Sequence, residues 1–167
     1  MNAHNQLHSY YVGLGSNIAP EINLRKAVGR LKKTCMISEI SNVYKSHSEG
    51  ARGPDFLNAV LYLKSNLDPN DFKSDILHVI EVDLGRIRTS DKNAPRTIDL
   101  DILLQNETVL DPNIWCRVYI AVPLAEFVPD LRDEVSGLKL KSIASRLRKQ
   151  YYIEKISLFR WNEFLEM

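Results

Sequence analysis

Two aspartates, Asp99 and Asp101, lie two residues apart in an alternating segment and are the strongest candidates for chemistry in this chain. A strand here would place both carboxylates on one face, with their Cβ atoms about 7 Å apart. Its other face would carry Ile98, Leu100, Ile102 and Leu104. At an effective dielectric constant near 20, two unpaired carboxylates at that distance repel by about 2 kcal/mol. The pair therefore favours a divalent cation such as Mg²⁺, which proteins commonly share with substrate phosphates.

Three arginines, Arg86, Arg88 and Arg96, precede the two aspartates in a segment that we predict to be a loop. Guanidinium groups match phosphate oxygens, so they suit the same ligand as the cation. An edge strand that carries solvated charges is the simpler alternative, and such strands are common. The arginines beside the aspartates favour the phosphate site. The chain has no GxxxxGK[ST] sequence, which excludes a P-loop kinase.

Three further features are candidates for ligand binding, and each has a structural alternative. The turn Gly15-Ser16-Asn17 offers backbone amides to an anion or a ligand edge, although many turns carry Gly and Asn for conformational reasons alone. Asn58, in an otherwise apolar strand, matches the donor and acceptor edge of a heterocycle, and a satisfied core asparagine is equally compatible. Tyr119 would stack on such a ring or belong to the core.

Length and composition limit the class of protein. A chain of 167 residues with a net charge of +1 favours a single domain and argues against nucleic-acid binding through overall basicity. Cys35 and Cys116 have neither CxxC spacing nor nearby histidines, so we expect reduced, buried thiols. The first residues are polar, and no apolar run is long enough to span a membrane. We expect a cytoplasmic protein without membrane or nucleic-acid partners.

The hydrophobic spacing predicts the order strand, helix, strand, strand, helix, strand. The expected ranges are 8–14, 20–31, 36–46, 56–67, 68–84 and 97–104. Asp68 and Pro69 mark the start of the second helix, and Gly85 marks its end. This order is typical of a ferredoxin-like α+β fold, an antiparallel sheet with helices on one face. After Asn106 we expect a short helix or turn at 123–129, a basic helix at 140–148 and a strand or helix from Tyr151 onward.

Several motifs recur in the order found in a known enzyme family. They are Gly15-Ser16-Asn17, Tyr44, PDFLNA at 54–59, the segment 81–88, PRTIDLDIL at 95–103 and Val122-Pro123-Leu124. With them, residues 11–132 resemble the 6-hydroxymethyl-7,8-dihydropterin pyrophosphokinase (HPPK) family, and PRTIDLDILL after GRIR is the most specific match. The resemblance implies one HPPK-like domain over residues 1–167, with a divergent extension at 133–167. It also implies a monomer or weak homodimer.

The resemblance implies an activity and a set of site residues. HPPK enzymes transfer the β,γ-pyrophosphoryl group of ATP to the pterin hydroxymethyl oxygen and release AMP, in folate biosynthesis. By this resemblance the catalytic residues are Arg86, Arg96, Asp99 and Asp101, and the two aspartates hold two Mg²⁺ ions. The pterin would contact Ser46, Phe56, Asn58 and Tyr119. The co-substrate ATP would contact Glu81, Arg88, Ile102 and Arg117.

Two features depart from the family pattern. The family's catalytic loop has Trp-Gly before Pro-Arg-Thr, whereas this chain has Asn93-Ala94, so we expect a missing or weakened cap over the pterin. The family also has a Pro-His-containing stretch before the arginine matched by Arg117, and residues 109–116 are too few to contain it. These departures leave two alternatives: a paralogue that binds pterin or nucleotide with little catalysis, and an enzyme for another alcohol. The retained Arg96 and aspartates favour the pyrophosphokinase.

Overall fold

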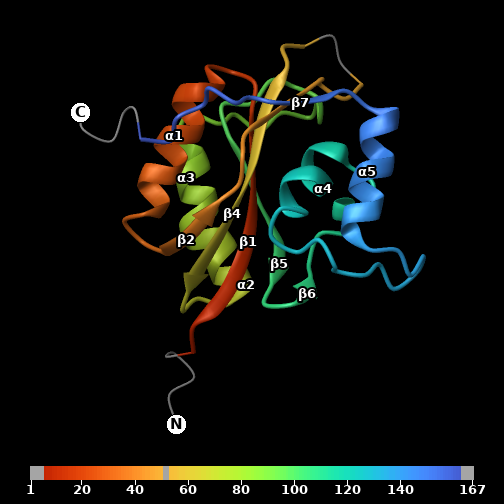
Figure 1. The fold of residues 1–167 in the computed structure, drawn as a ribbon. Coiled ribbons are helices and arrows are strands. Elements are labelled where there is room, and N and C mark those ends of the chain that lie inside the picture. Colours follow the sequence, from red (N-terminus) through yellow and green to blue (C-terminus); the bar gives the residue numbers. More distant parts are fainter. Residues whose placement is uncertain (1–5, 51–52, 163–167) are drawn as a thin grey trace.

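A computed structural model describes residues 6–50 and 53–162 and shows a central sheet between two groups of helices (Figure 1). Within these residues the sheet has seven strands: β1 (His8–Ser16), β2 (Met36–Ile40), β3 (Tyr44–Ser46), β4 (Phe56–Ser65), β5 (Asp99–Gln105), β6 (Thr108–Val109) and β7 (Ile153–Lys155). The helical elements are α1 (Pro20–Leu31), α2 (Pro69–Asp71), η2 (Phe72–Leu77), α3 (His78–Asp83), η3 (Pro112–Trp115), α4 (Val118–Leu124) and α5 (Leu140–Gln150).

The strand order confirms the ferredoxin-like fold. Across the sheet the strands run β6-β5-β1-β4-β3-β7, and β2 also pairs with β4. The sequence β5-β1-β4-β3 places the fourth, first, third and second predicted strands side by side, and their pairings are antiparallel. The predicted strand at 36–46 is divided into β2 and β3, and the pairing of β2 with β4 shifts register between Ile37 and Glu39. This irregularity agrees with the broken alternation of that segment.

The predicted helix at 68–84 forms with both predicted ends. The Asp68 side chain accepts hydrogen bonds from the backbone amides of Asn70 and Asp71, and Gly85 has a φ of 81°. Its middle, η2, is a π-helix, in which the bonded residues are five apart. Phe72 and Leu77, five residues apart in this turn, are both fully buried.

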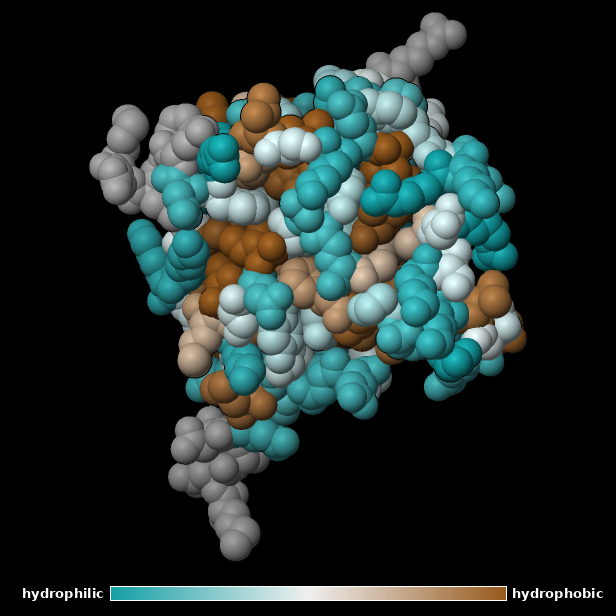
Figure 2. Space-filling model, viewed as in Figure 1, coloured by the Kyte–Doolittle hydropathy of each residue, from teal (hydrophilic) through white to brown (hydrophobic). Residues whose placement is uncertain are grey.

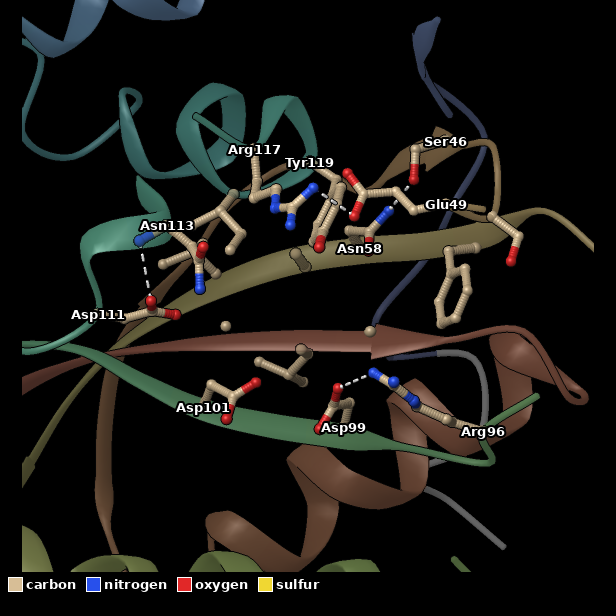
Figure 3. A pocket seen from close by; sticks show the side chains of 18 of the residues that line it. Ser46, Glu49, Asn58, Arg96, Asp99, Asp101, Asp111, Asn113, Arg117 and Tyr119 are labelled. Carbon is tan, nitrogen blue, oxygen red and sulfur yellow. Dashed lines mark hydrogen bonds and ion pairs between the residues drawn. The ribbon is translucent and has the colours of Figure 1, made fainter. Parts of the chain in front are cut away.

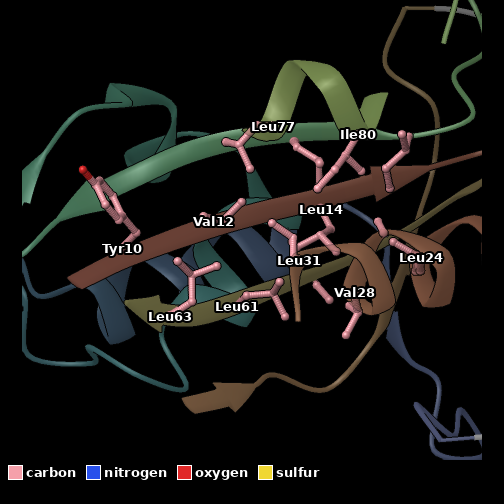
Figure 4. Packing of buried hydrophobic residues seen from close by; sticks show 14 of the residues in the cluster. Tyr10, Val12, Leu14, Leu24, Val28, Leu31, Leu61, Leu63, Leu77 and Ile80 are labelled. Carbon is pink, nitrogen blue, oxygen red and sulfur yellow. The ribbon is translucent and has the colours of Figure 1, made fainter. Parts of the chain in front are cut away.

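Helices cover both faces of the sheet, which extends the prediction of helices on one face. Helices α1 and α3 lie on one side in Figure 1, and α4 and α5 lie on the other. Between the sheet and the first pair of helices is a core built from residues of β1, β4, α1 and α3 (Figure 4). A second core packs α4 and α5 around Val60, Leu103 and Leu104. The second layer matters because it forms one wall of the candidate site.

Strand β5 matches its predicted alternation except near its end. Ile98 and Leu100 are buried in the first core, and Ile102 packs against it. Leu104, predicted on the same face, instead belongs to the second core. The β1–β5 pairing shifts register between Tyr11 and Val12, and this bulge reverses the faces of the residues beyond it.

The C-terminal extension packs on both the sheet edge and α1. Strand β7 pairs antiparallel with β3, with Ser46 opposite Ile153. Farther along, Phe159 packs against the first core, and the Arg25 guanidinium lies 4.4 Å from the centre of its ring. The part of the predicted strand or helix after Trp161 that falls at 163–167 lies outside the described residues.

The surface shows no dominant apolar patch on the face in view. Figure 2 shows brown hydrophobic side chains in separate places divided by teal hydrophilic ones. Cys116 is exposed and Cys35 is half-buried, so the expectation that both are buried is wrong. No helix in the described part of the chain is long and apolar enough to cross a membrane.

Candidate active site

A cavity of about 560 Å³ lies between the sheet and the second helical layer (Figure 3). That volume is within the usual range for small-molecule sites. Its floor is formed by β1, β4 and β5, and its walls by η3, α4 and the loops that follow β3 and precede β5. The predicted site residues that line it are Ser46, Phe56, Asn58, Arg96, Asp99, Asp101, Arg117 and Tyr119.

Strand β5 presents the two predicted carboxylates to this cavity. Asp99 pairs with Gly15 of β1, and Asp101 pairs with Gly13. Glycines at both partner positions mean that β1 adds no side chain to the floor beside the two carboxylates. A Cβ atom at Gly15 would lie 3.3 Å from Oδ1 of Asn58, closer than a comfortable contact. Gly15 therefore leaves room for the asparagine amide beside the carboxylates.

Asp99 is held by two arginines. The Arg86 guanidinium donates to Oδ1 of Asp99, and Nη1 of Arg96 donates to Oδ2 at 2.6 Å. The Arg96 backbone is fixed as well, because its amide donates to Oδ1 of Asn17 at 2.7 Å. Asn17 is buried and does not line the cavity. Asn17 of the predicted Gly-Ser-Asn turn thus positions the arginine loop, while Gly15 of the same turn lines the cavity.

A buried carboxylate, Glu81 of α3, supports Asp99 from behind. It is 2% exposed, and its Oε1 accepts from the Leu100 backbone amide at 2.9 Å and from Arg86 at 2.5 Å. Its Oε2 accepts from Arg88 at 3.0 Å. Glu81 therefore satisfies an amide of β5 located between the two aspartates and fixes the arginine that contacts Asp99.

Asp101 has an unusual protonation equilibrium. Burial, followed by the nearby charges of Asp99 and Asp111, raises its pKa from 3.8 to about 6. The side chain still reaches the cavity, where a bound cation would offset the repulsion from Asp99 and Asp111. Such crowded carboxylates are typical of sites whose charge is balanced by a ligand.

The opposite end of the cavity is formed by an amide, a hydroxyl and aromatic rings. Asn58 is 4% exposed, and its Nδ2 donates to Oγ of Ser46 at 2.9 Å and to the Tyr44 carbonyl oxygen at 3.4 Å. These contacts use both amide hydrogens. Phe56 and Tyr119 line the cavity nearby. Burial, together with the charge of Glu49, raises the pKa of Tyr119 to about 12.

Four of the predicted site residues lie outside this cavity. Glu81, Arg86 and Arg88 form the cluster behind β5, and Ile102 packs against the first core. The structure thus brings eight predicted residues together and places these four behind the floor.

Several cavity-lining residues were not predicted. They are His47, Glu49, Lys92, Asn93, Asp111 and Asn113. Asp111 accepts from the Asn113 amide at 2.9 Å at the start of η3, and the Asp-Pro pair there is the same helix-start signal that marks residue 68. Trp115 packs against the second core and does not line the cavity.

The carboxylates fit a cation only with help from a ligand. Among residues 6–50 and 53–162, no group of three or more His, Cys, Asp or Glu side chains is arranged to hold a metal ion. Mg²⁺, however, is usually held by one or two carboxylates together with substrate phosphates and water. The donor set of Asp99 and Asp101 fits that mode and does not fit a closed structural metal site.

The chain matches a known protein family over more than half of its length. The family model for 7,8-dihydro-6-hydroxymethylpterin-pyrophosphokinase (HPPK) matches residues 11–129. A Synechocystis protein named 2-amino-4-hydroxy-6-hydroxymethyldihydropteridine pyrophosphokinase is 36% identical over 143 residues, covering 79% of this chain and 72% of that protein. The Pseudomonas aeruginosa protein of the same name is 39% identical over 135 residues, covering 73% of this chain and 82% of the Pseudomonas chain.

Solved structures support the fold. The wild-type HPPK-DHPS of Plasmodium falciparum with pteroate superposes with a TM-score of 0.69 at 12% identity. The match covers 90% of this chain and 44% of the longer Plasmodium chain. At that identity the likeness concerns the fold alone. The family model and the bacterial relatives show that this chain belongs to the 7,8-dihydro-6-hydroxymethylpterin-pyrophosphokinase family.

Proposed function

We propose that this protein transfers pyrophosphate from ATP to the hydroxymethyl group of 6-hydroxymethyl-7,8-dihydropterin, with AMP as the other product. The observation that supports this most is that one cavity combines charged side chains suited to phosphates with an amide and aromatic rings suited to a pterin. Asp99, Asp101, Arg96 and Arg117 line it together with Asn58 and two aromatic side chains. The family's relatives carry the corresponding enzyme name. Because the reaction consumes ATP and belongs to folate biosynthesis, we place it in the cytoplasm.

The pterin end of the cavity is assigned to Asn58. Since its amide hydrogens go to Ser46 and the Tyr44 carbonyl, its Oδ1 is the atom left for a ring donor. The rings of Phe56 and Tyr119 provide flat apolar surfaces for stacking. This arrangement orients the hydroxymethyl arm toward the carboxylates on β5.

The phosphate end is assigned to the β5 carboxylates and two arginines. When bound, Mg²⁺ would be held by Asp99 and Asp101, two ions being expected, and would neutralise phosphate charge. Arg96 donates to Asp99 at 2.6 Å, and a phosphate oxygen bound beside Asp99 would compete for the same guanidinium group. Arg117 approaches from the opposite wall.

The reaction forms one P–O bond and breaks another. The pterin hydroxymethyl oxygen attacks the β-phosphorus of ATP, the bond from that phosphorus to the α,β-bridging oxygen breaks with its electron pair going to AMP, and the hydroxyl proton passes to solvent. No residue of the cavity is placed as a dedicated general base, so the protein contributes mainly by positioning and electrostatic stabilisation. Four predicted site residues lie behind the cavity floor and would not touch the substrates: Glu81, Arg86, Arg88 and Ile102. Of these, Arg86 influences the site through its hydrogen bond to Asp99.

The decisive experiment measures AMP formation from ATP with the hydroxymethyl dihydropterin, with and without Mg²⁺. We expect Mg²⁺-dependent AMP formation in the wild type. Asp99→Asn and Asp101→Asn each remove a carboxylate charge that would hold Mg²⁺, so we expect kcat to fall by orders of magnitude. Both variants keep the side-chain volume, so the fold should be unchanged. Glu134→Gln, on the exposed surface, is the matched control.

Other outcomes separate the alternatives. ADP in place of AMP, or turnover that survives both substitutions, would contradict the proposal. Pterin or nucleotide binding without turnover would identify a paralogue with little catalysis. This is the second candidate because the arginine loop has Asn93-Ala94 and the segment before Arg117 is short. Turnover restricted to another alcohol would identify a different acceptor. We expect a monomer or weak homodimer, as in the family.

A second prediction follows from Asp101. Its folded pKa is raised to about 6, so between about pH 4 and pH 6 the folded state binds more protons than the unfolded state. Stability contributed by this group is therefore present at low pH and is lost as pH rises through that window. We expect Asp101→Asn to melt at a higher temperature than wild type at pH 7.5, with the difference shrinking as pH falls and vanishing below about pH 3. A variant that melts lower at pH 7.5, measured by calorimetry without Mg²⁺, would contradict this.

A third prediction concerns Glu81 as a positioning residue. Glu81→Gln keeps an acceptor for the Leu100 amide but removes the charge that binds Arg86 and Arg88. We expect a loss of about 2 kcal/mol in the free energy of unfolding and a lower kcat, with the KM for pterin nearly unchanged. Denaturant titration and steady-state kinetics test this, with Glu134→Gln as control. A higher KM for ATP at full stability would instead place Glu81 in contact with the nucleotide.

A further inference from the structure

Arg117 is already paired with an anion supplied by the protein itself. Its Nη1 lies 2.7 Å from Oε2 of Glu49, which belongs to the loop after β3. Both residues line the cavity, and Figure 3 shows their side chains meeting above Tyr119. The ion pair thus spans two separate walls, the loop on one side and the start of α4 on the other.

The pair lies where an entering ligand would meet it. Both side chains are accessible, with Arg117 43% and Glu49 45% exposed. Ion pairs of this kind contribute little to stability and exchange partners readily. The carboxylate of Glu49 occupies the guanidinium edge that would otherwise be available to a phosphate oxygen.

We propose that Glu49 is an affinity-setting residue that binds Arg117 across the pocket and must be displaced when a nucleotide phosphate binds. This inference rests on the proposed function, in which Arg117 contacts ATP. A polyphosphate carries several charges and replaces the carboxylate, whereas a ligand without phosphates leaves the pair intact. Glu49 therefore makes phosphate binding weaker than the bare arginine would allow.

The neighbouring loop supports this role. Gly50 follows Glu49 with a φ of 63°, a conformation that favours glycine and turns the chain back at this point. A Cβ atom at Gly50 would lie 3.1 Å from Nδ2 of Asn93, so the turn lies against the loop that carries Arg96. Displacement of Glu49 would thus disturb the contact between the two loops at the cavity mouth.

Binding of a non-hydrolysable ATP analogue with Mg²⁺, measured by titration calorimetry, tests the inference. We expect Glu49→Gln to bind the analogue about two- to fivefold more tightly than wild type, the range that an exposed ion pair allows. The gain should shrink at high salt, because exposed charges are screened. Glu134→Gln, which makes the same charge change away from the cavity, should bind like wild type.

A double-mutant comparison locates the effect at Arg117. In an Arg117→Ala background, Glu49→Gln should give no tightening, since the competing pair is already absent. If the wild type forms AMP but Glu49→Gln binds the analogue no more tightly than the wild type does, the inference is overturned and the proposed function stands. A tightening that persists without Arg117 would overturn it as well. A wild type that neither binds the analogue nor forms AMP would overturn both.

Discussion

The buried carboxylate of Glu81 is the contact on which the candidate site depends. It joins α3 to the Leu100 amide of β5, at the point where that strand presents Asp99 and Asp101 to the cavity. Through Arg86 it also fixes one oxygen of Asp99. A buried charge is costly unless it is fully paired, and here it is paired with guanidinium groups and a backbone amide. The geometry of the floor therefore follows from a group that never faces the ligand.

Sequence patterns predicted the features of the fold that are determined by residues close together in the chain. The alternation over 98–102 placed both aspartates on one face, and Asp68 and Gly85 defined the ends of a helix as the structure has them. The bulge that moves Leu104 to the second core and the division of residues 36–46 into two strands depend on pairing with distant strands. The helix predicted at 140–148 forms as α5, but its place in a second layer depends on tertiary packing that periodicity does not show.

The strand residues of the site were predicted from their local pattern, whereas several of its loop residues were missed. Asn58 and the aspartates were recognisable because polar groups interrupt apolar strands, whereas Glu49 and Asp111 face the cavity only because of tertiary structure. The C-terminal extension is a similar case. Strand β7 pairs with β3, and the ring of Tyr152 stacks on His47 at 4.3 Å, so the extension supports the loop that carries Glu49. No local signal indicates such long-range contacts.

A crystal structure with a non-hydrolysable ATP analogue, Mg²⁺ and the hydroxymethyl dihydropterin tests the central claim most directly. The account predicts metal density between the phosphates and the carboxylates of Asp99 and Asp101, with the pterin ring against Asn58. It also predicts that Arg96 leaves Asp99 for a phosphate oxygen. Phosphates bound away from β5, or metal ions that touch neither carboxylate, would contradict it.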